Sequence, residues 1–215
     1  MSYFNDLTPY SYAGNNGGNV FNIGWLDNGC DFKKGELEEK FIKYLWEYVK
    51  YPINQTRGIF YNNYLDSQNN KFIASYEGYN ILLGSAEIRV FDSVRNCVYA
   101  SPNLIIHYIL NHHYLPPARF IHAVMNEPKP DSDEYSKLIR SSFNTNYISY
   151  SRLKCNYCQS NKTELGFTKL KEFINTNKVQ IIAVDKYTED SPDRYMYDII
   201  CKDCGKRFTL PYEMI

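Results

Sequence analysis

The sequence predicts an α+β fold, with an antiparallel sheet and packed helices in residues 1–127 and a smaller second domain in residues 134–215. Short apolar runs bounded by turn residues follow one another between residues 72 and 100, which is typical of antiparallel strands. Apolar residues recur at helical spacing in residues 36–50, which indicates an amphipathic helix. Two Cys-x-x-Cys pairs beyond residue 150 mark the smaller domain.

Charge and hydropathy argue against several classes of partner. The 215 residues include 24 basic and 24 acidic side chains, so no broad basic surface for nucleic acid is expected. No apolar run approaches the roughly 18 to 20 residues that a membrane span needs, and no basic and apolar leader opens the chain. We therefore expect a cytoplasmic protein without a membrane partner.

Helices in the first domain are predicted from apolar spacing and from proline. Apolar side chains recur every three or four residues between Leu37 and Val49, and Pro52 ends this helix. A later helix has Pro102 near its first turn and is apolar nearly all round, so we expect it in the core. The predicted helices are 36–50, 103–113 and 118–125, with Leu104, Ile105 and Ile109 buried together with Trp25.

Strands are predicted where short apolar runs lie between turn residues. The segment 92–96 has turn chemistry, so the runs on its two sides are expected to pair as a hairpin. The runs at 57–61 and 72–76 are weaker signals than the others. The predicted strands are 19–27, 57–61, 72–76, 80–83, 86–91 and 97–100.

The second domain is expected to follow a linker at residues 128–133, which is rich in proline and acidic residues. Between the two cysteine pairs, apolar residues from Phe167 to Ile174 have the spacing of one face of a short helix. These signals predict a ribbon with a helical insertion. Its elements are a helix over 134–143, a strand over 147–153, a helix through Phe167, Leu170, Phe173 and Ile174, and strands over 179–184 and 195–200.

The cysteine pairs, Cys155 with Cys158 and Cys201 with Cys204, predict a structural zinc site. Each Cys-x-x-Cys turn directs two thiolates at one ion, and two such turns complete the tetrahedron that zinc prefers. Four thiolates leave no open position for water or substrate. The six cysteines are also enough for three disulfides, but a chain without an export signal favours metal and leaves Cys30 and Cys97 as free thiols.

Several motifs in residues 3–125 point to a family. They are Asp6-Leu7-Thr8-Pro9-Tyr10-x-Tyr12, Gly24-Trp25-Leu26-Asp27, Arg57-Gly58, Gly84-Ser85-Ala86-Glu87-Ile88-Arg89-Val90, and Tyr99-Ala100-Ser101-Pro102-Asn103-Leu104-Ile105-x-His107-Tyr108 through His112-x-Tyr114-x-Pro116-Pro117-x-x-Phe120. Together they resemble an uncharacterised bacterial family. That family has no established activity, so the resemblance implies a domain boundary and no function. Its members carry a His-x-Cys-x-x-Cys cluster after the Arg-Gly pair, and this chain lacks those ligands.

Five polar residues are candidates for a functional cleft: Arg57, Glu87, Arg89, His107 and His112. Together they would supply an acid, a base and an anion clamp. The alternative is structural, because histidines five residues apart on a helix point about 140° apart and a Glu-x-Arg strand usually carries a salt bridge. The sequence has no phosphate loop, nucleophile elbow or spaced carboxylate pair.

Three function classes follow from these patterns. We prefer a non-catalytic interaction protein, such as an immunity or antitoxin protein that binds and blocks a toxin, because 21 tyrosines can serve as interface anchors. The alternative is a nucleic-acid-associated regulator that uses the ribbon, where Arg152, Lys154, Lys202, Lys206 and Arg207 lie near the ligands. An enzyme built on His107, Glu87 and Arg89 is third. The second class lacks charge and the third lacks a motif.

Overall fold

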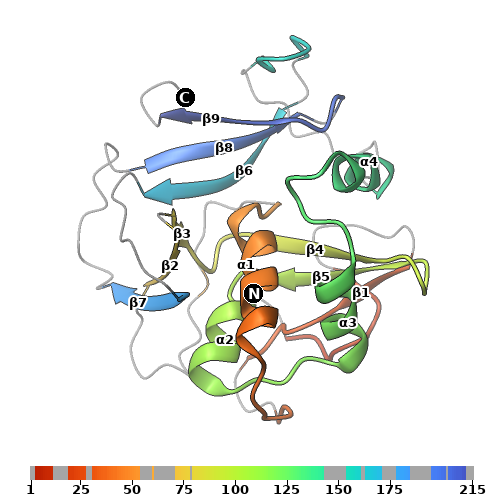
Figure 1. Ribbon diagram of the computed structural model, residues 1–215, viewed down its shortest axis with the longest axis vertical. Coiled ribbons are helices and arrows are strands. Elements are labelled where there is room, and N and C mark those ends of the chain that lie inside the picture. The colour runs from red at the N-terminus through yellow and green to blue at the C-terminus, as the bar shows by residue number, and fades with distance from the viewer. Residues whose placement is uncertain are drawn as a thin grey trace.

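The computed structural model describes residues 3–11, 19–27, 31–53, 60, 71–77, 79–142, 154–160, 163–170, 178–184, 195–201 and 203–211. Its helices are α1 (Glu39–Lys50), α2 (Ile105–His112), α3 (Ala118–Asn126) and α4 (Asp133–Ser142). Its strands are β1 (Val20–Asn22), β2 (Lys71–Tyr76), β3 (Tyr79–Leu82), β4 (Glu87–Asp92), β5 (Cys97–Pro102), β6 (Thr163–Leu170), β7 (Gln180–Val184), β8 (Tyr195–Cys201) and β9 (Arg207–Pro211). The fold is α+β, as predicted (Figure 1). None of the described helices has the length and apolar character that crossing a bilayer requires.

A small sheet has the order β1-β5-β4. β4 and β5 form the predicted antiparallel hairpin, with Glu87 opposite Pro102 and Asp92 opposite Cys97. β1 runs parallel to β5. The chain before β1 folds back along it, and Leu7 donates its N–H to the Asn22 carbonyl at 2.7 Å. This segment covers an edge of the sheet that would otherwise present unpaired backbone groups.

The larger sheet has six strands in the order β7-β2-β3-β6-β8-β9 and combines both parts of the chain. β2 pairs with β7 from Lys71 opposite Val184 onward, and β3 pairs with β6 through Ile81 and Lys169. The described strands therefore do not separate at residues 128–133, where the sequence suggests a boundary. In Figure 1 this sheet runs from β7, beside β2 and β3, up to β9.

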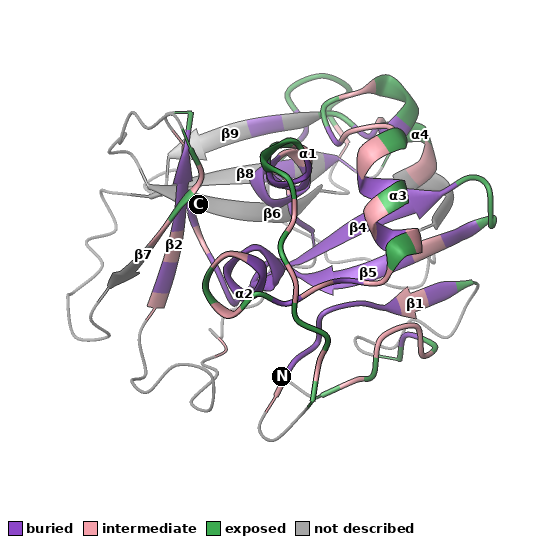
Figure 2. Cartoon of the chain, turned by 60° about the horizontal axis from the view of Figure 1, so that its bottom comes forward, coloured by how far each residue is buried: buried purple, intermediate pink, exposed green. Residues whose placement is uncertain are grey.

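Helix α1 lies between the two sheets and joins them into one core. It contacts β3 of the larger sheet and β4 of the smaller one, together with α2 and α3. The helix begins at Glu39, three residues after the predicted start, and ends at Lys50 as predicted. Figure 2 shows buried residues concentrated on α1, α2, β4 and β5. Leu104, Ile105, Ile109 and Trp25 are each 5% exposed or less, which confirms their predicted burial.

Residues 163–170 form strand β6, so the helix predicted from Phe167 onward is wrong as far as Leu170. β6 runs antiparallel to β8, with Thr163 opposite Cys201 and Leu170 opposite Tyr195. The register shifts between Leu165 and Phe167, which is where Gly166 stands. A glycine within a segment disfavours a helix and is typical of a bulge in a strand. Residues 171–174, the strand predicted at 147–153 and all but Phe60 of the strand predicted at 57–61 lie outside the described residues.

The predicted linker is held against the first part of the chain. The Glu127 carboxylate accepts hydrogen bonds from the backbone N–H and hydroxyl of Ser93 at 2.8 and 2.6 Å. The Lys129 ammonium donates to the Glu127 carbonyl at 2.7 Å and lies 4.9 Å from the Tyr44 ring centre. The Tyr48 hydroxyl donates to the Pro128 carbonyl at 3.0 Å. These contacts fix the path from α3 to α4.

Helix α4 packs on the smaller sheet, although the sequence assigns it to the second domain. Its Tyr135 is 1% exposed and belongs to the main core. The Tyr135 ring lies edge-on to Phe91 of β4 and Tyr48 of α1. Its hydroxyl donates to the Arg89 carbonyl at 2.8 Å. Tyr135 thus anchors α4 in the core of the first part of the chain.

Candidate functional site

Four cysteine side chains meet although they belong to two distant turns. The sulfur atoms of Cys155, Cys158, Cys201 and Cys204 all lie within 4.8 Å of one another. The Cys155–Cys204 and Cys158–Cys201 sulfur distances are both 3.6 Å, whereas a disulfide bond needs about 2.05 Å. Four sulfurs at about 2.3 Å from one ion stand about 3.8 Å apart in a tetrahedron. The cluster therefore has the dimensions of a four-coordinate metal site.

The two turns that carry these cysteines share one backbone design. In each turn the carbonyl of the first cysteine accepts a hydrogen bond from the N–H four residues later. The distances are 3.0 Å from Gln159 and 2.7 Å from Gly205. The N–H of each first cysteine donates to the carbonyl five residues later, at 2.9 Å in both turns. Gln159 and Gly205 both have a positive φ, at 60° and 71°. Two matched turns thus present their thiols to a common centre.

The thiols differ in acidity. Burial opposes ionisation of Cys155, but the N–H groups of Cys158 and Tyr157 stabilise its thiolate and bring its pKa down to about 7. Burial raises the pKa of Cys201 to about 12 and also raises the pKa of Cys204. A cation at the centre would offset this burial cost, because a thiol that coordinates a metal ion is deprotonated outright.

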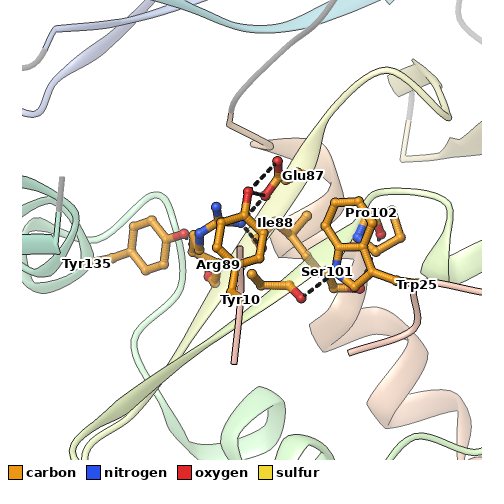
Figure 3. A network of polar contacts seen from close by, with 9 residues as sticks. Tyr10, Trp25, Glu87, Ile88, Arg89, Ser101, Pro102 and Tyr135 are labelled. Carbon is orange, nitrogen blue, oxygen red and sulfur yellow. Dashed lines mark hydrogen bonds and ion pairs between the residues drawn. The ribbon is translucent and has the colours of Figure 1, made fainter. Parts of the chain in front are cut away.

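A second polar group is buried beside the smaller sheet (Figure 3). The Arg89 guanidinium contacts the Glu87 carboxylate at 2.5 Å, and the Tyr10 hydroxyl donates to the same carboxylate at 2.9 Å. The Arg89 guanidinium also lies 4.7 Å from the Tyr10 ring centre. All three residues are 5% exposed or less. Burial lowers the pKa of Arg89, but the Glu87 carboxylate and Tyr10 together outweigh it and raise the pKa, so Arg89 stays charged.

The two candidate histidines meet each other. The Nε2 atoms of His107 and His112 are 3.3 Å apart, and their rings are nearly perpendicular. Their five-residue spacing predicts divergent side chains, but α2 ends at His112 and His113 has a left-handed φ of 58°. The His107 ring also stacks on Phe72 of β2, with ring centres 3.9 Å apart. His107 is buried, whereas His112 is partly exposed.

Among the described residues, four of the five cleft candidates make contacts in two separate pairs. Glu87 and Arg89 form one group, and His107 and His112 form another. No hydrogen bond or ion pair joins these groups within the part of the chain that the structure describes. Arg57 lies outside the described residues.

Sequence reasoning missed Tyr10, which completes the Glu87–Arg89 group. It also missed Asp6, whose carboxylate accepts hydrogen bonds from the Gly24 N–H at 2.8 Å and from the Tyr114 hydroxyl at 2.7 Å. Gly24 has a φ of 68°, and an added Cβ would lie 3.1 Å from the Ile105 side chain. The only available signal was that these residues stand in the quoted motifs, because no local pattern relates positions so far apart.

The comparisons agree with the motifs. Residues 2–125 match the family model described as "Domain of unknown function (DUF7919)". No curated protein and no solved structure matches the chain. The matched part contains the Glu87–Arg89 group, the two histidines and the Asp6 contacts, whereas the four cysteines lie beyond it. Since the match covers more than half of the 215 residues, the chain belongs to the DUF7919 family.

Proposed function

We propose that this protein acts by binding a partner protein, without catalysis, and that zinc at the four cysteines supports its structure. The observation that carries the proposal is that the side chains that resemble catalytic residues are already buried and paired. Glu87 and Arg89 are buried, and their charges are balanced by each other and by the Tyr10 hydroxyl. A carboxylate and a guanidinium arranged in this way serve folding, because substrate would have to displace existing hydrogen bonds.

Zinc is the metal that best fits the four-cysteine cluster. Thiolate ligands select zinc, copper(I) or iron–sulfur clusters, and a single tetrahedral site of four cysteines is typical of structural zinc in ribbons. The sulfur spacing of 3.6 Å and the matched turns support this assignment. Zinc with four thiolates has no open coordination position and no redox activity. The metal therefore fastens residues 154–160 to the end of β8.

An immunity or antitoxin protein of the bacterial cytoplasm fits this description. Such a protein blocks a toxin by covering its surface, which requires a rigid structure and no reaction. The core that α1 builds with both sheets supplies rigidity. The reducing cytoplasm keeps the cysteines out of disulfides, so that they can bind metal.

Stoichiometry separates blocking from catalysis. Products of genes beside this one are expressed singly, and any that arrests growth is tested with and without this chain. We expect this chain to relieve the growth arrest caused by one of these products and to form a one-to-one complex with it. Protection should stop once the concentration of the toxin exceeds that of this chain. Protection at a small fraction of the toxin concentration would show turnover and overturn the non-catalytic assignment. If this chain relieves the growth arrest of no neighbouring product, the immunity assignment is wrong. As a control, His112→Ala at its partly exposed position should keep protection.

A further inference from the structure

An exposed aromatic ring stands at the tip of the first cysteine turn. Tyr157, between Cys155 and Cys158, is 58% exposed. Its ring meets Phe208 edge-on, with ring centres 6.5 Å apart. The Lys206 ammonium, from the second turn, lies 5.0 Å from the Tyr157 ring centre. A cation and an open ring are thus held together by the two turns.

The sequence segments that carry the two turns are rich in positive charge, which the whole chain lacks. Residues 152–162 and 201–207 contain six basic residues and one acidic residue, whereas the chain has 24 of each kind. A zinc ion with four thiolates contributes a formal charge of about −2, which leaves these two sequence segments positive by about three. The acidic residue, Asp203, accepts a hydrogen bond of 2.6 Å from the Ser160 hydroxyl, which ties the two turns together.

We infer that Tyr157, Lys154 and Lys206 bind single-stranded nucleic acid, with one base stacked on Tyr157. We call these three residues the tip. Every base has a π face, so stacking on an aromatic side chain needs no particular sequence. The Lys206 ammonium lies at the ring, and the exposed Lys154 directly precedes the first cysteine turn. Both add positive charge that the phosphates of a stacked strand require.

A nucleic-acid strand suits the tip better than a protein does. A protein interface needs an apolar core of several side chains. Among the described residues, the large apolar side chains that are exposed are Tyr3, Val94 and Tyr157, and of these Tyr157 alone lies in the cysteine turns. One ring with the Lys206 ammonium beside it is enough to stack a base. Because a duplex hides its base faces, the tip should prefer a single strand. This site is additional to the toxin-binding role proposed above.

Fluorescence anisotropy on the full zinc-loaded chain tests the inference. The probe is a labelled oligothymidylate of about 12 nucleotides at ~50 mM salt, compared with a duplex of the same length. We expect tighter binding to the single strand, and binding about five- to hundredfold weaker for Tyr157→Ala. Tyr157→Phe keeps the ring and should bind as the wild type does. Lys206→Gln should reduce the salt slope by about 0.7, the loss of one phosphate contact.

Tyr3→Ala is the matched control, because Tyr3 is an exposed tyrosine outside the cysteine turns and its loss should leave binding unchanged. Zinc content and melting temperature are measured for each variant, so that a folding defect is recognised. The inference is overturned if Tyr157→Ala binds as tightly as the wild type, or if the duplex is preferred. It is also overturned if the wild type binds no oligonucleotide. In that case Tyr157→Ala is tested for loss of a protein partner. Such a loss would assign the ring to a protein interface.

Discussion

At the scale of single residues, Asp92 shows how a buried charge is held by side chains close to it in the sequence. Asp92, at the end of β4, is 1% exposed. Its carboxylate accepts hydrogen bonds from the Tyr99 hydroxyl at 2.7 Å and from the Arg95 guanidinium at 2.9 Å. Burial raises the pKa of Asp92, but these donors together lower it below its ordinary value of 3.8. The folded state therefore favours the ionised carboxylate.

This shift predicts a pH dependence. A depressed pKa contributes stability that is present above pH 3.8 and is lost as the pH falls through the folded pKa. We expect Asp92→Asn to lower the unfolding free energy by about 1 to 3 kcal/mol at neutral pH. The difference from wild type should shrink as the pH falls below about 4. Urea unfolding across this range measures it. The exposed Asp131, as Asp131→Asn, is the control, and a difference that stays constant with pH would contradict the assignment.

At the scale of elements, α2 shows why a nearly apolar helix belongs in the core. It contacts β2 and β7 as well as α1, so it packs on more than one neighbour. Leu104, just before its first residue, is 2% exposed. The Tyr108 N–H donates to the Leu104 carbonyl at 3.1 Å, which starts the helical hydrogen bonding. Position 104 therefore combines a backbone role with a buried side chain.

Leu104→Ala should lower the unfolding free energy by about 2 to 5 kcal/mol, because truncation leaves a cavity in a packed core. The backbone hydrogen bond is kept, so the loss reports side-chain packing. Leu110→Ala, at a partly exposed position on the same helix, should cost less than half as much. Unchanged stability of Leu104→Ala in urea unfolding would show that α2 is peripheral.

At the scale of the whole molecule, the cysteine turns are connected to the DUF7919 domain through the larger sheet. β8 carries Cys201, β6 pairs with β8, and β3 pairs with β6. β2 and β3 belong to the core that surrounds α1. The sheet therefore offers a route by which loss of the metal reaches the first part of the chain.

Purified protein should contain one zinc per chain, and Cys204→Ser should lose it. Structural zinc contributes about 10 to 16 kcal/mol of binding free energy, so we expect protease to cleave Cys204→Ser between residues 150 and 215. The core around α1 and the smaller sheet should persist, with β2 and β3 less protected than β4 and β5. Metal analysis and limited proteolysis measure these effects.

Cys97→Ser, outside the cluster, is the control and should keep its zinc. Less than half an equivalent of zinc in wild type, or a native disulfide among the four cysteines, would contradict the site.

What the sequence alone determined is local. Helices α1 to α4, the β4–β5 hairpin and the two Cys-x-x-Cys turns follow from spacing, turn residues and short motifs, because helical hydrogen bonds and tight turns join residues a few positions apart. The tertiary structure alone decided which strands pair across the chain, and so that β6 is a strand joined to β3. It also decided that Tyr10 reaches Glu87 and that the two histidines meet. Strand backbones bond to distant segments, and a buried polar side chain finds its partner only after the core has formed.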